Sequence, residues 1–81
     1  MKKKLSRCIA VYEKTGDKLI KVIPLVKKEF ESVRAILGHK ADDEMIYCYA
    51  IKSVYLPKIQ KVVRRNLKMA GFDYFLETTQ G

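Results

Sequence analysis

Histidine and cysteine, which supply many metal ligands and catalytic groups, are nearly absent from this sequence of 81 residues. The chain has one histidine, His39, and two cysteines, Cys8 and Cys48, at scattered positions. Their spacing is not that of a zinc site, and it indicates no disulfide framework. Two isolated cysteines in a cytosolic protein are typically reduced and buried, so we expect this of Cys8 and Cys48.

The sequence also lacks the motifs of common enzymes. It has only four glycines, and neither a glycine-rich phosphate loop nor a G-x-S-x-G nucleophile elbow occurs. A domain of this length hides only about 60 to 65% of the surface of its unfolded chain, which leaves little room for a deep substrate pocket. The sequence therefore predicts a binding module and not an enzyme, with no catalytic residue, no metal and no cofactor.

Long apolar segments are missing as well. No stretch approaches the roughly 18 apolar residues of a membrane-spanning helix. The basic start, Met1 to Lys4, resembles the first part of a signal peptide, but Arg7 and Glu13 interrupt the apolar segment that would have to follow. We therefore expect a cytoplasmic protein that forms a single domain over residues 1–81.

Acidic residues are few, since 9 Asp and Glu stand against 17 Lys and Arg, a formal net charge of +8. Such a charge on a small domain indicates an anionic partner, such as nucleic acid or the acidic face of a protein. Between residues 45 and 72 the chain has no acidic residue and six basic ones. These six are Lys52, Lys58, Lys61, Arg64, Arg65 and Lys68.

Hydrophobic periodicity indicates the elements of the first half. Alternation predicts strands over residues 5–13 and 18–25, joined by a tight turn into a hairpin. Pro24 has no N–H to give to a ladder, so the second strand ends there or lies at a sheet edge. Apolar spacings of four, three and four predict a helix over residues 26–37, followed by Gly38. Its apolar face consists of Val26, Phe30, Val33, Ile36 and Leu37.

The second half continues the pattern. Residues 45–51 are rich in β-forming residues and predict a short third strand. Pro57 suits the first turn of a second helix, which Gly71 ends, and a strand follows from Phe72. The apolar stripe of this helix consists of Ile59, Val62, Val63, Leu67 and Ala70. The expected fold is α+β, of order β-β-α-β-α-β, with the hairpin in an antiparallel or mixed sheet and two helices on one face.

The predicted second helix carries the main candidate surface. Lys58, Lys61, Arg65 and Lys68 are three, four and three residues apart and so share one stripe, with Arg64 beside it. A solvated helix face usually mixes signs, because opposite charges one turn apart stabilise it. A stripe of one sign is either such a face without pairing or a surface for an anionic partner.

A cluster of acidic residues, Asp42, Asp43 and Glu44, stands in the predicted loop after the first helix. Adjacent acids point in different directions and do not converge on one metal, so a turn or cap is the first interpretation. Contact with a basic partner is the alternative. His39 follows Gly38 at the helix end, where partial positive charge is favoured, and is expected to be structural.

Nucleic-acid recognition is a second interpretation of the basic stripe. The basic residues of a helix over residues 57–69 would contact phosphates, and Tyr47, Tyr49 and Tyr55 would stack on bases. However, the sequence has neither a helix-turn-helix pair nor an RRM signature. The basic surface therefore favours a protein partner, with nucleic acid as the alternative.

Several passages taken together resemble a known family. They are RCIAVYEKTGDKLIKVIPL, then a helix ending in Leu37-Gly38, then DDEM and YCYAI, and finally FDYFLETTQ. In this order they resemble small bacterial immunity proteins that accompany polymorphic toxins, including those of contact-dependent growth inhibition. The resemblance covers nearly the whole chain, and its motifs are mostly structural. The matching positions are Gly16, Pro24, Gly38, Asp42, Asp43, Tyr49, Ile51, Tyr74, Phe75 and Glu77.

The resemblance implies a protein that binds a cognate toxin domain and neutralises it by stoichiometric interaction. The basic stripe would dock on an acidic toxin surface. Alternatively, the less numerous acidic residues would enter a basic active site of the toxin; these are Asp42, Asp43 and Glu44, with Asp73 and Glu77. The larger basic excess favours the first arrangement. The alternatives are a small nucleic-acid-binding or regulatory protein that uses residues 57–69, and an interaction module whose acidic partner is unrelated to toxins.

Overall fold

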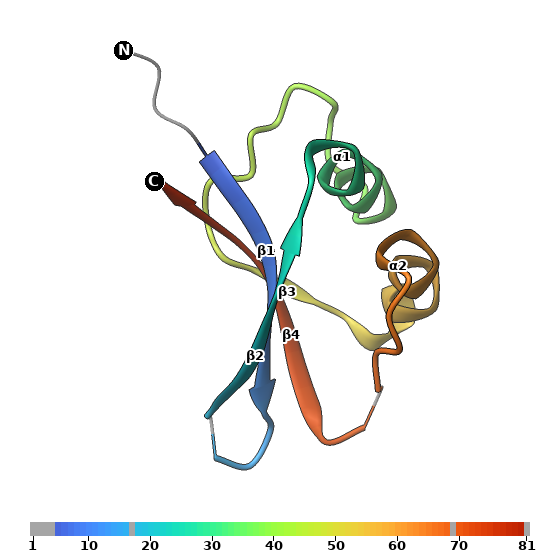
Figure 1. Ribbon diagram of the computed structural model, residues 1–81. Helices are drawn as coiled ribbons and strands as arrows, with labels where there is room; N and C mark the ends of the chain where they lie inside the picture. The colour runs from blue at the N-terminus through green and yellow to red at the C-terminus, as the bar shows by residue number, and fades with distance from the viewer. Residues whose placement is uncertain (1–4, 17, 69, 81) are drawn as a thin grey trace.

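Four strands and two helices follow one another in the order β-β-α-β-α-β in the computed structural model (Figure 1), which describes residues 5–16, 18–68 and 70–80. The strands are β1 (Leu5–Glu13), β2 (Leu19–Leu25), β3 (Tyr49–Ile51) and β4 (Phe72–Gln80). The helices are α1 (Lys27–Ile36) and α2 (Leu56–Val63), and a 3₁₀ turn, Ser53–Tyr55, leads into α2. The predicted α+β class and element order are confirmed.

All strand pairs are antiparallel, and the sheet has the order β2-β1-β4-β3. The central strands β1 and β4 pair along their whole length, from Leu5 opposite Gln80 to Glu13 opposite Phe72. β1 and β2 form the predicted hairpin. β2 lies at the edge of the sheet, where Pro24 is tolerated because the missing N–H interrupts no further ladder.

Both helices cover one face of the sheet (Figure 1), as predicted. Alternate residues of the central strands point to this face, and Ile9, Val11, Tyr74 and Leu76 are buried there. The remaining core residues are Ile23, Leu25, Phe30, Val33, Met45, Ile51, Leu56, Ile59, Val63 and Leu67. Neither of the described helices covers the opposite face, which we call the open face and whose side chains are partly exposed, as at Cys8, Tyr12 and Phe75.

α1 begins and ends close to its predicted bounds. The N–H of the N-cap residue Val26 donates to Oε1 of Glu29 at 3.0 Å, and Gly38 ends the helix with a φ of 82°. Phe30 and Val33 are buried as predicted, but Val26 is 64% exposed. Its backbone is extended, because it is the cap and not part of the helix, so its side chain does not follow the apolar face.

The third strand is shorter than predicted. Of residues 45–51, only Tyr49–Ile51 pair with β4. Met45 has a φ of 47°, a left-handed conformation that does not continue a strand. The Met45 side chain is buried, and its carbonyl oxygen accepts a hydrogen bond from Oγ1 of Thr78 at 2.9 Å. Met45 therefore attaches the loop to the sheet before the short strand begins.

α2 ends much earlier than predicted. It has eight residues and stops at Val63, because Arg64 takes a left-handed conformation with a φ of 56°. Leu67 of the predicted apolar stripe lies in the irregular segment after the helix, and its side chain is still buried in the core. Ala70 is exposed. Met69, also part of the predicted helix, lies outside the described residues. Neither α1 nor α2, the helices that the structure describes, is long and apolar enough to cross a membrane.

Candidate functional site

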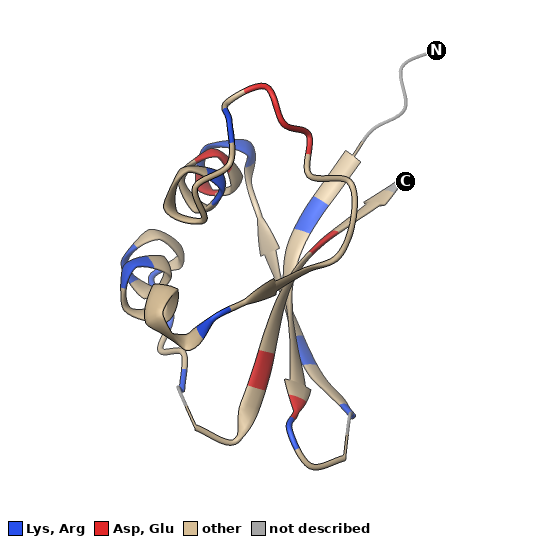
Figure 2. Ribbon diagram, turned by 180° about the vertical axis from the view of Figure 1, so that it is seen from behind, with Lys and Arg blue, Asp and Glu red and all other residues tan. Residues whose placement is uncertain are grey.

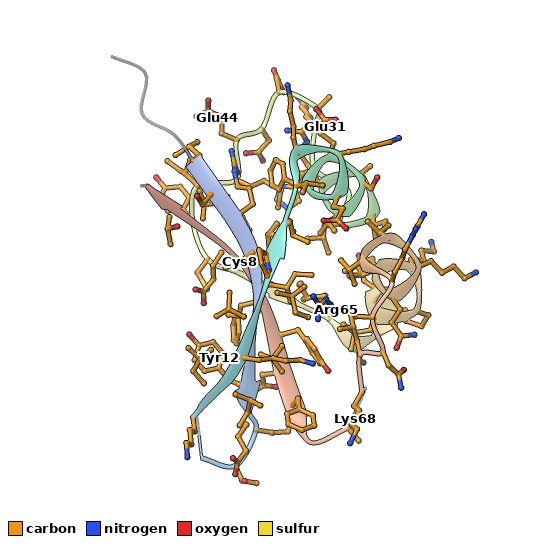
Figure 3. The ribbon with its side chains drawn as sticks, in the orientation of Figure 1. Cys8, Tyr12, Glu31, Glu44, Arg65 and Lys68 are labelled. Carbon is orange, nitrogen blue, oxygen red and sulfur yellow. The ribbon has the colours of Figure 1, made fainter. Side chains whose placement is uncertain are left out.

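The five basic residues of the predicted stripe stand on two kinds of backbone. Lys58 and Lys61 lie three residues apart on α2, and both are exposed. Arg64 is the C-cap of the helix, and Arg65 and Lys68 belong to the irregular segment that follows. The prediction of one continuous helical stripe is therefore wrong, since the helix ends halfway along it. Figure 3 shows Arg65 near the end of α2 and Lys68 well below it.

Three hydrogen bonds fix the segment that follows α2. The N–H of Arg64 donates to the carbonyl oxygen of Gln60 at 2.8 Å, and the N–H of Leu67 donates to Oε1 of Gln60 at 2.6 Å. The hydroxyl of Tyr74, on β4, donates to the carbonyl oxygen of Lys68 at 2.8 Å. Because the Leu67 side chain is buried as well, the basic side chains project from a backbone that is held in place.

None of these five basic side chains forms an ion pair with another described residue. Among the residues that the structure describes, ion pairs join Lys14 to Asp73 at 3.9 Å and His39 to Asp43 at 2.9 Å. In Figure 2 the basic segments of α2 and of the chain after it have no acidic segment among them. Because like charges repel one another at this spacing, an anionic partner would stabilise the arrangement.

The acidic candidates Asp42, Asp43 and Glu44 lie elsewhere, in the loop between α1 and β3 that stands above α1 in Figure 2. Asp42 and Glu44 are exposed, whereas the carboxylate of Asp43 forms hydrogen bonds with neighbouring residues of the same loop. Its Oδ2 lies 2.9 Å from Nδ1 of His39, and its Oδ1 accepts the N–H of Met45 at 2.9 Å. The hydrogen bond with His39, followed by that of Met45, lowers the pKa of Asp43. Asp43 thus acts as a turn residue, and the acidic and basic candidates do not form one site.

The tyrosines predicted to stack on bases do not share a surface. Tyr47 is 71% exposed, whereas Tyr49 and Tyr55 pack against the core. The ring of Tyr49 meets His39 edge-on, with ring centroids 5.2 Å apart. A stacking platform requires exposed rings on one face, and these three rings do not provide it. The contacts of His39 with Tyr49 and Asp43 are structural ones.

The open face of the sheet carries a cluster of side chains that belongs to no sequence motif. Tyr12 and Phe75 meet edge-on there, with ring centroids 5.6 Å apart. The hydroxyl of Tyr12 donates to Oε2 of Glu77 at 3.3 Å, and Sγ of Cys48 lies 3.7 Å from the same oxygen. Cys8 stands opposite Glu77 in the strand register. The alternation of β1 and β4 placed these residues on one face, but their meeting depends on the pairing of the two strands.

Both cysteines are free, but they differ in exposure. Cys8 is half-buried and Cys48 is exposed, so the prediction of buried thiols is wrong for Cys48. Burial, followed by the negative charge of Glu77, raises the pKa of each thiol. A raised pKa keeps a thiol protonated at neutral pH and makes it a poor nucleophile. Over the described residues, no group of three or more His, Cys, Asp or Glu is placed to hold a metal ion.

The fold and these surfaces belong to a defined family. A family model matches residues 6–77, so the chain belongs to DUF7683, a domain of unknown function. The match runs from β1 into β4 and therefore includes the sheet, both helices and the basic segment after α2. No curated protein and no solved structure matches the chain.

Proposed function

We propose that this DUF7683 domain is an immunity protein that binds a bacterial toxin domain of the contact-dependent inhibition type in the cytoplasm and neutralises it by stoichiometric binding. The sequence resemblance supports the identity of the partner. One structural observation supports the binding surface: Lys58, Lys61, Arg64, Arg65 and Lys68 are exposed, and none forms an ion pair within the described residues. We call these five residues the α2 basic surface.

A protein partner fits the α2 basic surface because its backbone is already ordered. Hydrogen bonds to Gln60 and from Tyr74 fix the segment beyond the helix, so binding need not order it. An acidic toxin face would be steered toward this surface, and partners of the same charge would be repelled. Asp42 and Glu44, which are exposed but stand in a separate loop, would lie outside the main contact.

The shortened helix weakens the alternative of nucleic-acid reading. An eight-residue helix spans about 12 Å, and only Lys58 and Lys61 among its residues are basic. The two tyrosines packed on the core, Tyr49 and Tyr55, do not present their faces to bases. Nucleic acid therefore remains as an outcome that the binding experiment must separate from a protein partner.

The direct test measures binding to the toxin domain encoded beside the gene. The variant Lys58→Glu/Lys61→Glu/Arg65→Glu reverses three charges of the α2 basic surface. We expect the wild-type chain to bind the toxin one-to-one and to protect cells that express it. The variant should bind about 100-fold more weakly at low salt, because each reversed charge at an interface weakens binding by roughly 1 kcal/mol or more.

The matched control reverses three exposed lysines outside the α2 basic surface, in Lys18→Glu/Lys28→Glu/Lys40→Glu. This control changes net charge by the same amount and should bind as the wild type does. Equal affinities of the α2 variant and the wild type at low salt would exclude the α2 basic surface. Submicromolar binding to duplex DNA or RNA at about 150 mM salt, with a steep salt dependence and no toxin binding, would replace the immunity role by nucleic-acid binding.

A further inference from the structure

We propose that the hollow bordered by β1, β2 and α1 is an oxyanion-binding site, built around Arg7 and Arg34, for the phosphate or carboxylate group of a ligand. The hollow has a volume of about 540 Å³. Leu5 and Leu25 contribute apolar wall from the two strands, and Phe30 contributes its ring from α1. The site is distinct from the α2 basic surface, with which it shares no residue.

Two guanidinium groups pack against the Phe30 ring. The Cζ atom of Arg7 lies 4.0 Å from the ring centroid, and that of Arg34 lies 5.1 Å from it. Both distances are within cation–π range, so the ring contacts two positive charges, and the charge of Arg34 is near enough to act on Arg7. Burial is the main cause of the lowered pKa of Arg7; Glu44 opposes this effect, and the charge of Arg34 adds to it. An anion that bound both groups would relieve their repulsion.

The hydrogen-bond acceptors of the two guanidinium groups are neutral oxygens, and the carboxylates of Glu44 and Asp43 act on the arginines only from outside hydrogen-bond range. Nη1 of Arg7 donates to the carbonyl oxygen of Glu44 and, at 3.2 Å, to Oγ1 of Thr78. Nη1 of Arg34 donates to the carbonyl oxygen of Asp43 at 3.2 Å. Neither arginine is in an ion pair with a residue that the structure describes. Since a guanidinium has five N–H donors, these bonds orient each group and leave donors for a ligand.

The charge of the lining selects the ligand class. Lys27 also lines the hollow, and Glu31 is the acidic residue there, so three basic residues face one acidic residue. The planar donors of arginine match the oxygens of a carboxylate or a phosphate, and the apolar wall accommodates the body that carries the group. The ligand expected is therefore an oxyanion attached to an apolar or aromatic body.

Amide chemical shifts of the ¹⁵N-labelled chain test the site. Inorganic phosphate and benzoate are titrated separately, and sodium chloride at equal ionic strength is the reference. We expect saturable shifts at Arg7, Phe30 and Arg34. A response to phosphate alone assigns a phosphate site, a response to benzoate alone assigns a carboxylate site, and a response to both assigns a general oxyanion site.

Substitutions separate a binding role from a structural one. Arg34→Gln should weaken binding about tenfold, the effect of one charge-assisted hydrogen bond, while Arg34→Lys keeps the charge and should weaken it less. Lys18→Gln, which removes one exposed charge before β2, should leave binding unchanged. A lower melting temperature of Arg34→Gln with unchanged affinity would make Arg34 structural only and overturn the proposal. Shifts no larger than those with chloride would overturn it too, whatever the toxin experiment shows.

Discussion

The carboxylate of Asp43 closes the loop between α1 and β3 through its bonds with His39 and with the N–H of Met45. These bonds lower its pKa. A carboxylate whose pKa is lower in the folded state stabilises the fold above its unfolded pKa of about 3.9, and this stabilisation is lost as the pH falls through the lower folded value. We predict that Asp43→Asn lowers the urea midpoint at neutral pH and that its difference from wild type shrinks in acid.

The control for this prediction is the neighbouring Asp42, which is exposed. Asp42→Asn should leave the urea midpoint near that of the wild type at every pH. If the effect of Asp43→Asn were equally large in acid and at neutral pH, ionisation of Asp43 would not be its source.

Glu77 adds to the effect of burial on the thiol next to it. Burial and the charge of Glu77 raise the pKa of Cys48, which is nevertheless exposed to reagents. Glu77→Gln removes the charge, so a larger fraction of Cys48 should be thiolate at neutral pH. We predict faster alkylation by iodoacetamide, followed by mass spectrometry in a Cys8→Ser background. Asp73→Asn removes a charge from the same strand face, but Asp73 is not among the groups that raise the pKa of Cys48, so this variant should not change the rate.

At the scale of elements, the two helices differ in how far the sequence predicts them. For α1, the apolar spacing and Gly38 both mark the end of the helix, and the prediction is correct to within a residue or two. For α2, the spacing continues through Leu67, although the helix stops at Val63. Leu67 is buried from irregular chain that Gln60 and Tyr74 hold in place. Local periodicity contains no information on such contacts, so it cannot distinguish the two cases.

Gln60 is the residue on which the segment after α2 depends. Its Oε1 accepts the N–H of the buried residue Leu67 at 2.6 Å. Gln60→Ala leaves this N–H without its partner, and we predict a loss of about 1 to 2 kcal/mol in the free energy of unfolding by urea. Lys61→Ala, an exposed change on the same helix, should alter it by less than about 0.5 kcal/mol. Equal losses for both variants would show that the bond contributes nothing specific.

The candidate sites show the same limit. Lys58 and Lys61 could be assigned to an exposed helix face from their spacing alone. Arg7 and Arg34 could not be assigned to one site, because they come from a strand and a helix far apart in the sequence and are related only through their packing on Phe30. The spacing of residues in the sequence can thus predict a site on one element. A site between two elements can be recognised only when the packing of those elements is known.

At the scale of the whole molecule, the centre of the sheet determines stability. Leu76 on β4 is fully buried and stands between Ile9 on β1 and Tyr49 on β3. Leu76→Ala removes contacts with both neighbouring strands and with the core, and we predict a loss of about 2 to 5 kcal/mol. Small domains have only about 5 to 15 kcal/mol in total, so urea unfolding should shift to much lower denaturant. Thr79→Ala, on the exposed side of the same strand, should have little effect.

The pairing of β1 with β4 also bears on how the protein folds during its synthesis. A ribosome releases the hairpin of β1 and β2 long before β4, and a hairpin alone is marginally stable in water. The sheet therefore cannot form before residues 72–80 are synthesised. The pairing of β1 with β4 joins segments that are distant in the chain, and such pairing slows folding. During this interval the edge of β1 that later pairs with β4 is unpaired and lies in the same hairpin as the apolar strand β2, Leu19–Leu25. Nascent chains that end before β4 should consequently bind chaperones and aggregate more readily than the complete chain.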